Sequence, residues 1–437
     1  MTDAIAPEWL ARQRWFRAKQ RPIATIIEVD RVPVPGDAAL AVAEVAYADG
    51  GAPDHYLLVQ GAGHEPADGD GAWRALVRAM ADGARLAGSV GSVVCSSTEA
   101  LEALLPDASS AAASLTERRL RVEQSNTSVV LGDRLILKLF RLLEPGESPD
   151  VEISAFLTDV GFADTPALAG SITWHPDGGA PATAAMLQAY VPSHGDAWAA
   201  MLDALADDPS RGIAMAAELG GLTARMHAAL ASRPGDAAFP ARPATVEETA
   251  GWRASAERQL AQAVTAVSGE EHERLVRIAP AIRERFADTF GAATGEATVS
   301  RIHGDYHLGQ LLARHDGGFS VIDFEGEPAR PLEERRLPSS PLRDVAGLLR
   351  SLDYAARTAE AGRRAPGFDP EPWLRDARAA FLASYGQPAS HDASLLDAFE
   401  LEKACYEVRY EANNRPDWLW LPLAAVERLA RPVSRGP

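Results

Sequence analysis

The sequence predicts an α+β fold in which a strand-rich first part precedes a mainly helical second half. Three observations support this prediction. A chain of 437 residues is too long for one ordinary hydrophobic core, so two or three cores are expected. Between residues 23 and 61, apolar residues alternate with polar ones between turn residues, as strands require. After Val191, apolar residues recur mainly at helical spacing.

Each predicted element rests on a local pattern. Residues 23–47 and 56–61 predict an antiparallel meander, and residues 72–87 and 98–105 have helical apolar spacing. The Ala/Ser-rich run 107–114 is expected to be a linker or loop where a first domain ends. Segments 128–131 and 134–140 flank Gly132-Asp133, a hairpin signal, and a helix is expected from Pro149 to Val160. Further helices are expected over residues 198–206, 212–230, 246–267 and 270–289, and a hairpin bearing charged residues between 299 and 325.

Composition excludes several classes of protein. The formal net charge is −18, which disfavours nucleic acid and anionic lipid as partners. The two cysteines, Cys95 and Cys405, lie far apart without metal-ligand spacing, so both are expected to be buried thiols in a reducing compartment. The sequence shows no signal peptide and no long uncharged apolar run, so a cytoplasmic protein without a membrane span is expected.

The most informative segment is RIHGDYHLGQLL at residues 301–312, followed by VIDFEGEP at 321–328. Asp305 and Asp323 each end a short apolar run, and Gln310 lies between them. A carboxylate that can take a hydroxyl proton, together with an amide and a second carboxylate that can hold magnesium, indicates phosphoryl transfer. For either half alone, a surface hairpin with solvated aspartates is as good an interpretation. The two halves together favour the chemistry.

These two motifs resemble the catalytic loop and metal-binding segment of the aminoglycoside-phosphotransferase-like kinases, in their maltokinase and actinobacterial glucosamine kinase branch. The resemblance extends over most of the chain, through EWLARQRWF, EQSNTSVV, LILKLF, SPLRDVAGLLRSLDYAA and YEVRYEANNRPDWLWLPL. It implies a bilobal, protein-kinase-like fold with an additional N-terminal cap subdomain. The domains expected are a cap over 1–114, a β-rich nucleotide-binding subdomain and hinge over 115–191, and a helical lobe over 192–437.

The resemblance also implies roles for individual residues. Asp305 would be the catalytic base, and Gln310 and Asp323 the magnesium ligands. On the nucleotide side, Lys138 would face the ATP phosphates and Glu152 would pair with it. The polar stretch Ser125, Asn126, Thr127 and Ser128 either caps phosphates or is an ordinary polar turn before a strand. The hinge that holds adenine through its backbone would comprise Gln188, Ala189, Tyr190 and Val191.

The acceptor site is expected on a C-terminal helix. Tyr406 and Tyr410, and likewise Glu407 and Glu411, are four residues apart, so two aromatic rings and two carboxylates lie on adjacent stripes. Such groups bind sugars, although a plain amphipathic helix has the same spacing. Further residues assigned to the acceptor site are Asn414, Trp418 and Trp420. Relative to maltokinases, Asn413 stands at a basic position and Trp420 is an additional indole, which predicts a narrower, more acidic pocket for an amino sugar.

The predicted function is an ATP-dependent, magnesium-dependent sugar kinase that converts glucosamine to glucosamine 6-phosphate, acting as a monomer. Two alternatives stay open, namely a maltokinase that makes maltose 1-phosphate and a catalytically silent sugar-binding protein with a kinase fold. His303 and His307 are expected to shape the catalytic loop rather than to bind zinc. Glu325 and Glu327 form either an acidic strip near the metal or exposed loop charges. The N-terminal residues Trp9, Arg14 and Trp15 are expected to pack the first domain.

Overall fold

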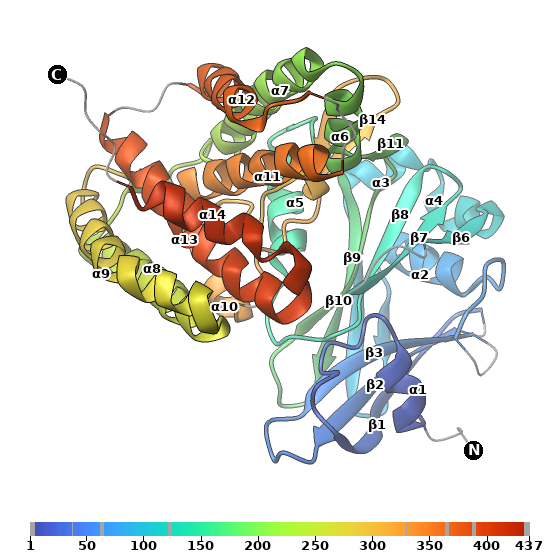
Figure 1. Cartoon of the computed structure of the whole chain (residues 1–437). Helices are drawn as coiled ribbons and strands as arrows, with labels where there is room; N and C mark the ends of the chain where they lie inside the picture. The colour runs from blue at the N-terminus through green and yellow to red at the C-terminus, as the bar shows by residue number, and fades with distance from the viewer. Residues whose placement is uncertain are drawn as a thin grey trace. The chain divides into compact units, whose positions relative to one another are not determined.

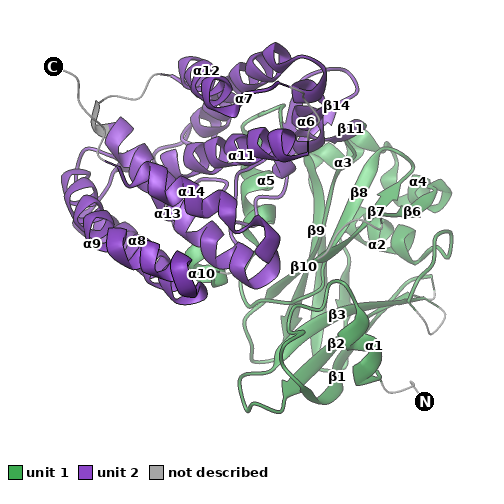
Figure 2. Ribbon diagram, in the orientation of Figure 1, with its two compact units in different colours: residues 1–192, 330–334 green, residues 193–329, 335–437 purple. Residues whose placement is uncertain are grey.

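The computed structural model describes residues 5–36, 38–61, 65–120, 125–328, 330–362, 367–386 and 390–431. Its chain divides into two compact units (Figure 2). The first contains residues 1–192 and 330–334, and the second contains residues 193–329 and 335–437. Within the described residues, no helix combines the length and the apolar character needed to cross a membrane.

The first unit begins with an antiparallel meander, as predicted. After helix α1 (Pro7–Arg12), strands β1 (Ile23–Val34), β2 (Ala38–Tyr47) and β3 (Asp54–Gly61) form one sheet in the order β1-β2-β3 (Figure 1). One face packs on a small core that contains Trp15 and Tyr56, which are 3% and 0% exposed. The packing role predicted for Trp15 is thereby confirmed. Trp9 instead keeps 38% of its surface exposed and meets Trp15 edge to face.

A seven-stranded antiparallel sheet is the second sheet of the first unit. Its strand order is β4-β5-β9-β10-β8-β7-β6. The strands are β4 (Arg85–Ala87), β5 (Gly91–Ser97), β6 (Glu117–Arg119), β7 (Asn126–Leu131), β8 (Leu135–Phe140), β9 (Leu168–Pro176) and β10 (Ala182–Ala189). The hairpin predicted at Gly132-Asp133 is confirmed, and both residues have positive φ (60° and 49°), as the tight type I′ turn requires.

Short helices border this sheet. They are α2 (Ala72–Ala81), α3 (Glu99–Leu104), α4 (Ala108–Ala111), the 3₁₀ turn η1 (Ala112–Ser114) and α5 (Pro149–Asp159). The first unit also takes in most of α10 (Leu332–Arg335), much later in the chain. The prediction of a linker over residues 107–114 was wrong, because Ala108 and Ala112, four residues apart, are both buried in the sheet's core. That core draws on residues from Val32 to Leu187. The domain boundary at residue 114 stays a prediction.

The second unit is mainly helical. Its helices are α6 (Ala197–Asp207), α7 (Pro209–Leu230), α8 (Val246–Ala266), α9 (Gly269–Ala292), α11 (Leu342–Ala361), α12 (Pro370–Tyr385), α13 (Ser390–Asn414) and α14 (Trp420–Leu429), with 3₁₀ turns η2 (Leu308–Gln310) and η3 (Pro416–Trp418). A small sheet has the order β11-β14-β15 (Ser193–Asp196, Leu311–Arg314 and Phe319–Val321), and β12 (Arg242–Pro243) pairs with β13 (Thr298–Val299). The predicted helices and the hairpin within 299–325 are confirmed. Cys95 and Cys405 are free and buried, as predicted.

One buried carboxylate links the meander to the seven-stranded sheet. Asp30 in β1 is 0% exposed. Its oxygens accept hydrogen bonds from Ser89 N (2.8 Å), Val90 N (3.1 Å) and Trp174 Nε1 (2.8 Å). The turn between β4 and β5 and the strand β9 are therefore held to β1 through a single side chain.

Replacing Asp30 with alanine is expected to destabilise the first unit by ~3 kcal/mol, because the buried Trp174 indole and the two loop amides lose their shared acceptor together. Urea unfolding measures the change in free energy. Asp49→Ala is the matched control, since Asp49 is an exposed aspartate of the same unit whose ion pair with Arg21 (2.7 Å) is screened by solvent, so a much smaller loss is expected. Equal losses in the two variants would contradict a linking role for Asp30.

Candidate active site

The predicted catalytic base lies in a short loop between β13 and η2. Asp305 has a side chain that is 20% exposed, so solvent or an acceptor can reach it. His303 is buried, its Nε2 lies 2.9 Å from Ile322 O, and its Nδ1 accepts a hydrogen bond from Asp305 N (3.3 Å). The expectation that His303 shapes the loop is confirmed. His307 Nε2 lies 3.9 Å from Asp305 Oδ2, and its Nδ1 accepts from Gly309 N.

A second aspartate, which the sequence analysis did not single out, holds this loop. Asp344 in α11 is 1% exposed and accepts hydrogen bonds from His303 N (2.8 Å) and Gly304 N (2.9 Å). His227 Nε2 lies 3.1 Å from Asp344 Oδ2, and its Nδ1 lies 3.1 Å from Tyr385 Oη. Burial alone would raise the pKa of Asp344, but these hydrogen bonds and the nearby imidazoles hold the pKa below its ordinary value.

Helix α11 approaches the loop so closely that a glycine is needed. A Cβ atom on Gly347 would lie 2.5 Å from Tyr306 O, a distance that no side chain can occupy. The close approach places α11 against the residue that follows Asp305. The backbone around the base is thus fixed from one side by Asp344 and by this contact.

The predicted magnesium ligands are brought together by the β14–β15 hairpin. Ile322 N donates to Gln310 O (3.0 Å), so Gln310 stands opposite the residue that precedes Asp323. Asp323 itself has a φ of 69°, in the left-handed region that non-glycine residues seldom adopt. Such strain is found preferentially at functional sites. Both side chains offer oxygen atoms, the donors that Mg²⁺ prefers.

The acidic residues that follow Asp323 are not exposed. Glu325 and Glu327 are 7% and 8% exposed, so the alternative of solvated loop charges was wrong. Glu327 Oε1 accepts a hydrogen bond from Lys403 Nζ (2.7 Å). Lys403, in α13, also donates to Asp305 Oδ1 (3.3 Å). Sequence reasoning missed this lysine.

In the first unit, Lys138 lies in β8 as predicted, with its side chain 12% exposed. Its Nζ forms an ion pair of 2.8 Å with Asp150 Oδ2, from the first turn of α5. Ser148 Oγ caps this helix by accepting from Asp150 N. Asp150 was not predicted as a partner, and the pairing of Lys138 with Glu152 stays a prediction.

The polar stretch 125–128 lies mostly within strand β7 and not before it, contrary to the prediction. Only Ser125 precedes the strand, whereas Asn126, Thr127 and Ser128 lie within β7 and are buried. Thr127 Oγ1 accepts a hydrogen bond from Arg141 Nε (2.8 Å). Strand β7 therefore begins at Asn126, before the predicted start at Ser128. The buried guanidinium of Arg141 donates to the Thr127 hydroxyl, so a polar residue type that is common in turns is accommodated inside the strand.

The predicted hinge lies at the end of β10. Gln188 is buried, and its Nε2 donates to Ser154 Oγ (3.2 Å). The backbone N–H groups of Ala189 and Tyr190 already donate to carbonyls of the same unit, Ala167 O (3.0 Å) and Arg134 O (2.8 Å). In the described part of the chain, the N–H of Val191 donates to no backbone carbonyl. Whether these residues hold a nucleotide stays a prediction.

The aromatic stripe of the predicted acceptor helix is present in α13. The rings of Tyr406 and Tyr410 stack, with centroids 6.3 Å apart and planes at 21°. Burial raises the pKa of Tyr406 to about 12, whereas Tyr410 keeps 43% of its surface exposed.

The carboxylates of this helix are paired with arginines, and a pocket more acidic than that of maltokinases stays a prediction. Glu407 Oε2 accepts from Arg350 (3.0 and 2.7 Å). Glu411, 1% exposed, accepts from Arg415 Nε (2.9 Å) and from Tyr354 Oη (3.3 Å). Each carboxylate therefore already has an arginine partner, and a sugar ammonium would compete with a guanidinium.

The remaining residues of the predicted acceptor site lie at the surface or near it. Asn413 and Asn414 are exposed, and their amides donate to the carbonyls of Arg409 and Tyr410. Trp418 is partly buried beside Arg415, and Trp420 is 47% exposed. Their contact with a substrate stays a prediction.

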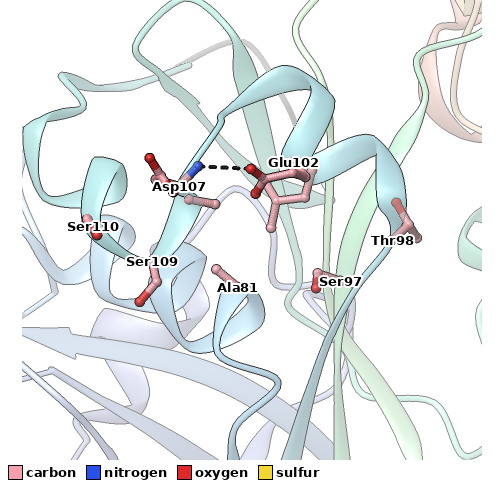
Figure 3. Close-up of a pocket in the computed structure, with 9 residues that line it drawn as sticks. Ala81, Ser97, Thr98, Glu102, Asp107, Ser109 and Ser110 are labelled. Atoms are coloured by element: carbon pink, nitrogen blue, oxygen red, sulfur yellow. Dashed lines mark hydrogen bonds between the residues drawn. The ribbon is translucent and has the colours of Figure 1, made fainter.

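The first unit also contains an open cavity of about 240 Å³ (Figure 3). It lies between the end of α2, the start of α3 and the turn before α4, where Glu102 Oε1 accepts from Asp107 N (3.2 Å). None of the residues predicted for ATP, magnesium or sugar lines this cavity. The candidate active site is therefore elsewhere.

Comparison with known families identifies the class. The maltokinase N-terminal cap domain matches residues 9–88, and the phosphotransferase enzyme family matches residues 116–381. The chain belongs to the phosphotransferase enzyme family. The resemblance drawn from the sequence and the predicted α+β kinase-like fold with an N-terminal cap are confirmed.

Within that class, the chain is similar to glucosamine kinases. That of Streptacidiphilus jiangxiensis is 34% identical over 70% of this chain and 72% of its own. That of Mycolicibacterium smegmatis is 31% identical over 72% of this chain and 79% of its own. A solved glucosamine kinase in complex with glucosamine, ADP and inorganic phosphate is 29% identical, with a TM-score of 0.71 over 98% of this chain and 100% of that one. Crystal form B of a glucosamine kinase gives a TM-score of 0.74 at 28% identity, over 98% of both chains.

Proposed function

We propose that this protein is an ATP-dependent sugar kinase that phosphorylates glucosamine to glucosamine 6-phosphate. The bond between the γ-phosphorus and the bridging oxygen of ATP breaks, a bond from phosphorus to the sugar hydroxyl oxygen forms, and ADP leaves. The hydroxyl proton passes to the carboxylate of Asp305. The observation that carries the proposal is this carboxylate, partly exposed and held by its loop, in a chain that matches a glucosamine kinase over 98% of its length.

Magnesium is the proposed metal. Gln310 and Asp323 would hold it through an amide and a carboxylate oxygen, and the hairpin that aligns their backbones supports this assignment. When bound, the ion would neutralise charge on the ATP phosphates. The backbone of Asp323 is in a strained, left-handed conformation, which is consistent with a functional need to point this side chain in one direction.

The nucleotide is proposed to bind through the first unit. Lys138, whose ammonium is fixed by Asp150, would face the phosphates. Val191 N–H would donate to the adenine ring. A cation that is already held in place stabilises the charge of a transferring phosphoryl group more than a mobile cation does, because it need not reorganise at the moment of reaction.

The acceptor is tested with a panel of glucosamine, N-acetylglucosamine, glucose, maltose and an aminoglycoside, each incubated with ATP and magnesium and analysed by mass spectrometry. Glucosamine is expected to have the highest kcat/KM. N-acetylglucosamine has the same ring without the ammonium, so it reports on recognition of that charge. Absence of product from glucosamine, with ATP turnover on another sugar, would reject this acceptor and retain the kinase.

Maltose is the second candidate acceptor, because the N-terminal region matches the maltokinase cap. A second sugar ring needs space near Trp420, so Trp420→Ala should improve maltose if that indole excludes it. A catalytically silent sugar-binding protein would show no ATP turnover with any member of the panel.

Lys138→Met is expected to raise the KM for ATP and to lower kcat by about 10-fold or more, because the phosphate oxygens lose a fixed positive partner. The KM for glucosamine should change less than about 2-fold. Steady-state kinetics with each substrate varied in turn measure both. Arg134→Met is the control, since Arg134 lies in the turn just before the same strand but its side chain is not assigned to the nucleotide. Unaltered ATP kinetics in Lys138→Met would place the nucleotide elsewhere.

A further inference from the structure

Lys403 is an unusual cation for this chain. Of the 43 basic residues, only Lys19, Lys138 and Lys403 are lysines, so arginine is the ordinary choice. Arginine is a planar fork that binds a carboxylate through both oxygens, whereas a lysine ammonium is a compact point charge. A lysine at a buried carboxylate cluster therefore indicates that a contact to one oxygen is preferred there.

The ammonium is anchored on a buried carboxylate. Lys403 Nζ lies 2.7 Å from Oε1 of Glu327, whose side chain is 9% exposed, and 4.6 Å from the ring centroid of Tyr406. Burial alone would lower the pKa of Lys403, but the carboxylates of Glu327 and Asp305 raise it above its ordinary value, so the amine is charged. Glu327 and Tyr406 together fix where this charge is held.

From that anchor, Lys403 reaches one oxygen of the predicted base. Nζ lies 3.3 Å from Asp305 Oδ1. The other oxygen, Oδ2, has His307 Nε2 at 3.9 Å, which is too far for a hydrogen bond. Within the described residues, Oδ2 accepts no hydrogen bond. Lys403 thus holds the Asp305 carboxylate through Oδ1, whereas Oδ2 is open to a substrate hydroxyl.

We propose that Lys403 is a positioning residue for Asp305, anchored by Glu327, which binds Oδ1 and leaves Oδ2 to take the proton of the acceptor hydroxyl. This inference rests on the proposed function, because it assigns the proton to Asp305. It explains why the cation is a lysine, since a guanidinium fork could occupy both oxygens. Lys403 itself need not touch ATP or the sugar.

The test is a double-mutant cycle on kcat in the full-length protein. Lys403→Met is expected to lower kcat by about 10-fold to 10²-fold, because the base loses its orientation, while the KM for ATP changes less than about 2-fold. In an Asp305→Asn background, Lys403→Met should cost less than about 2-fold more, since the group that it positions is already disabled. The same loss in both backgrounds would overturn the proposal.

Two further variants separate positioning from folding. Lys403→Arg keeps the charge and the partner Glu327, so thermal stability should stay near wild type while kcat falls by about 10-fold. Full activity in Lys403→Arg would overturn the single-oxygen contact. Arg409→Met is the matched control, because Arg409 lies on the same helix and contacts the same Tyr406 ring at 5.2 Å, but donates to Gln262. Its kcat should stay within about 2-fold of wild type.

The proposed function and this inference fail in different ways. Failure of wild type to use glucosamine rejects the acceptor, and the cycle is then run with the sugar that the panel identifies, or with acceptor-free ATP hydrolysis in which water replaces the sugar. In that assay, Lys403→Met should lower the rate of ATP hydrolysis more when Asp305 is present than in the Asp305→Asn background. Equal losses of rate in the two backgrounds would reject the positioning role of Lys403. A wild-type protein with no ATP turnover would overturn both.

Discussion

Asp305→Asn is expected to lower kcat for sugar phosphorylation by about 10² or more, since a positioned general base typically contributes 10² to 10⁴. The amide has nearly the size of the carboxylate but cannot take the hydroxyl proton. ATP binding should stay near native, because the residues assigned to the nucleotide belong to the first unit and are unchanged.

Single-turnover kinetics and equilibrium ATP binding measure the two effects separately. Asp316→Asn serves as the control, because Asp316 lies in the β14–β15 turn of the same unit with a side chain that is 80% exposed. Its rate should equal that of the wild type. Near-native turnover of Asp305→Asn with saturating acceptor would show that the base is another group.

Asp344→Asn is expected to lower kcat by about 10-fold or more and to destabilise the second unit by ~2 kcal/mol. One carboxylate oxygen becomes an NH₂ group, which must face either Gly304 N–H at the Oδ1 position or both His303 N–H and His227 Nε2 at the Oδ2 position. A donor then meets a donor in a site that is 1% exposed. The loop around Asp305 loses one of its two fixed amide contacts.

Kinetics and urea unfolding distinguish the two effects of this change. Asp207→Asn is a matched exposed substitution on α6, where the side chain is 69% exposed, and it should alter neither quantity appreciably. Wild-type kcat in Asp344→Asn would mean that the loop keeps its shape without the carboxylate. Where Asp344→Asn unfolds, His227→Gln removes one partner and keeps the loop amides bonded, so a smaller loss of kcat is expected.

Local signals explain which parts of the fold could be predicted. The Gly132-Asp133 turn and the Pro149 start of α5 lie within a few residues of the structure that they specify, and both are confirmed. Strands β9 and β10 were not predicted. Seven of the eight residues of β10 are buried, so the strand lacks the alternation by which half-buried strands are found.

The candidate site divides in the same way. Asp305, Gln310 and Asp323 fall within one short segment whose residue types suggest their chemistry. Asp344 and Lys403 lie 41 and 98 residues from their partners in that segment. Only tertiary packing brings α11 and α13 to the loop, and no spacing in the sequence reports it. The Arg350 partner of Glu407, 57 residues away, is the same kind of contact.

The strand order of the seven-stranded sheet sets a condition on folding during synthesis. Ser96 in β5 pairs with Ser171 in β9, and these residues are 75 positions apart. When the β4–β5 hairpin leaves the ribosome, its partner strand β9 has not yet been synthesised. The free edge of β5 therefore stays unpaired until residues up to Pro176 have emerged. Exposed strand edges recruit other chains. The N-terminal cap region is therefore synthesised first, but the sheet that contains β4 and β5 is completed only when strands β9 and β10 have both left the ribosome.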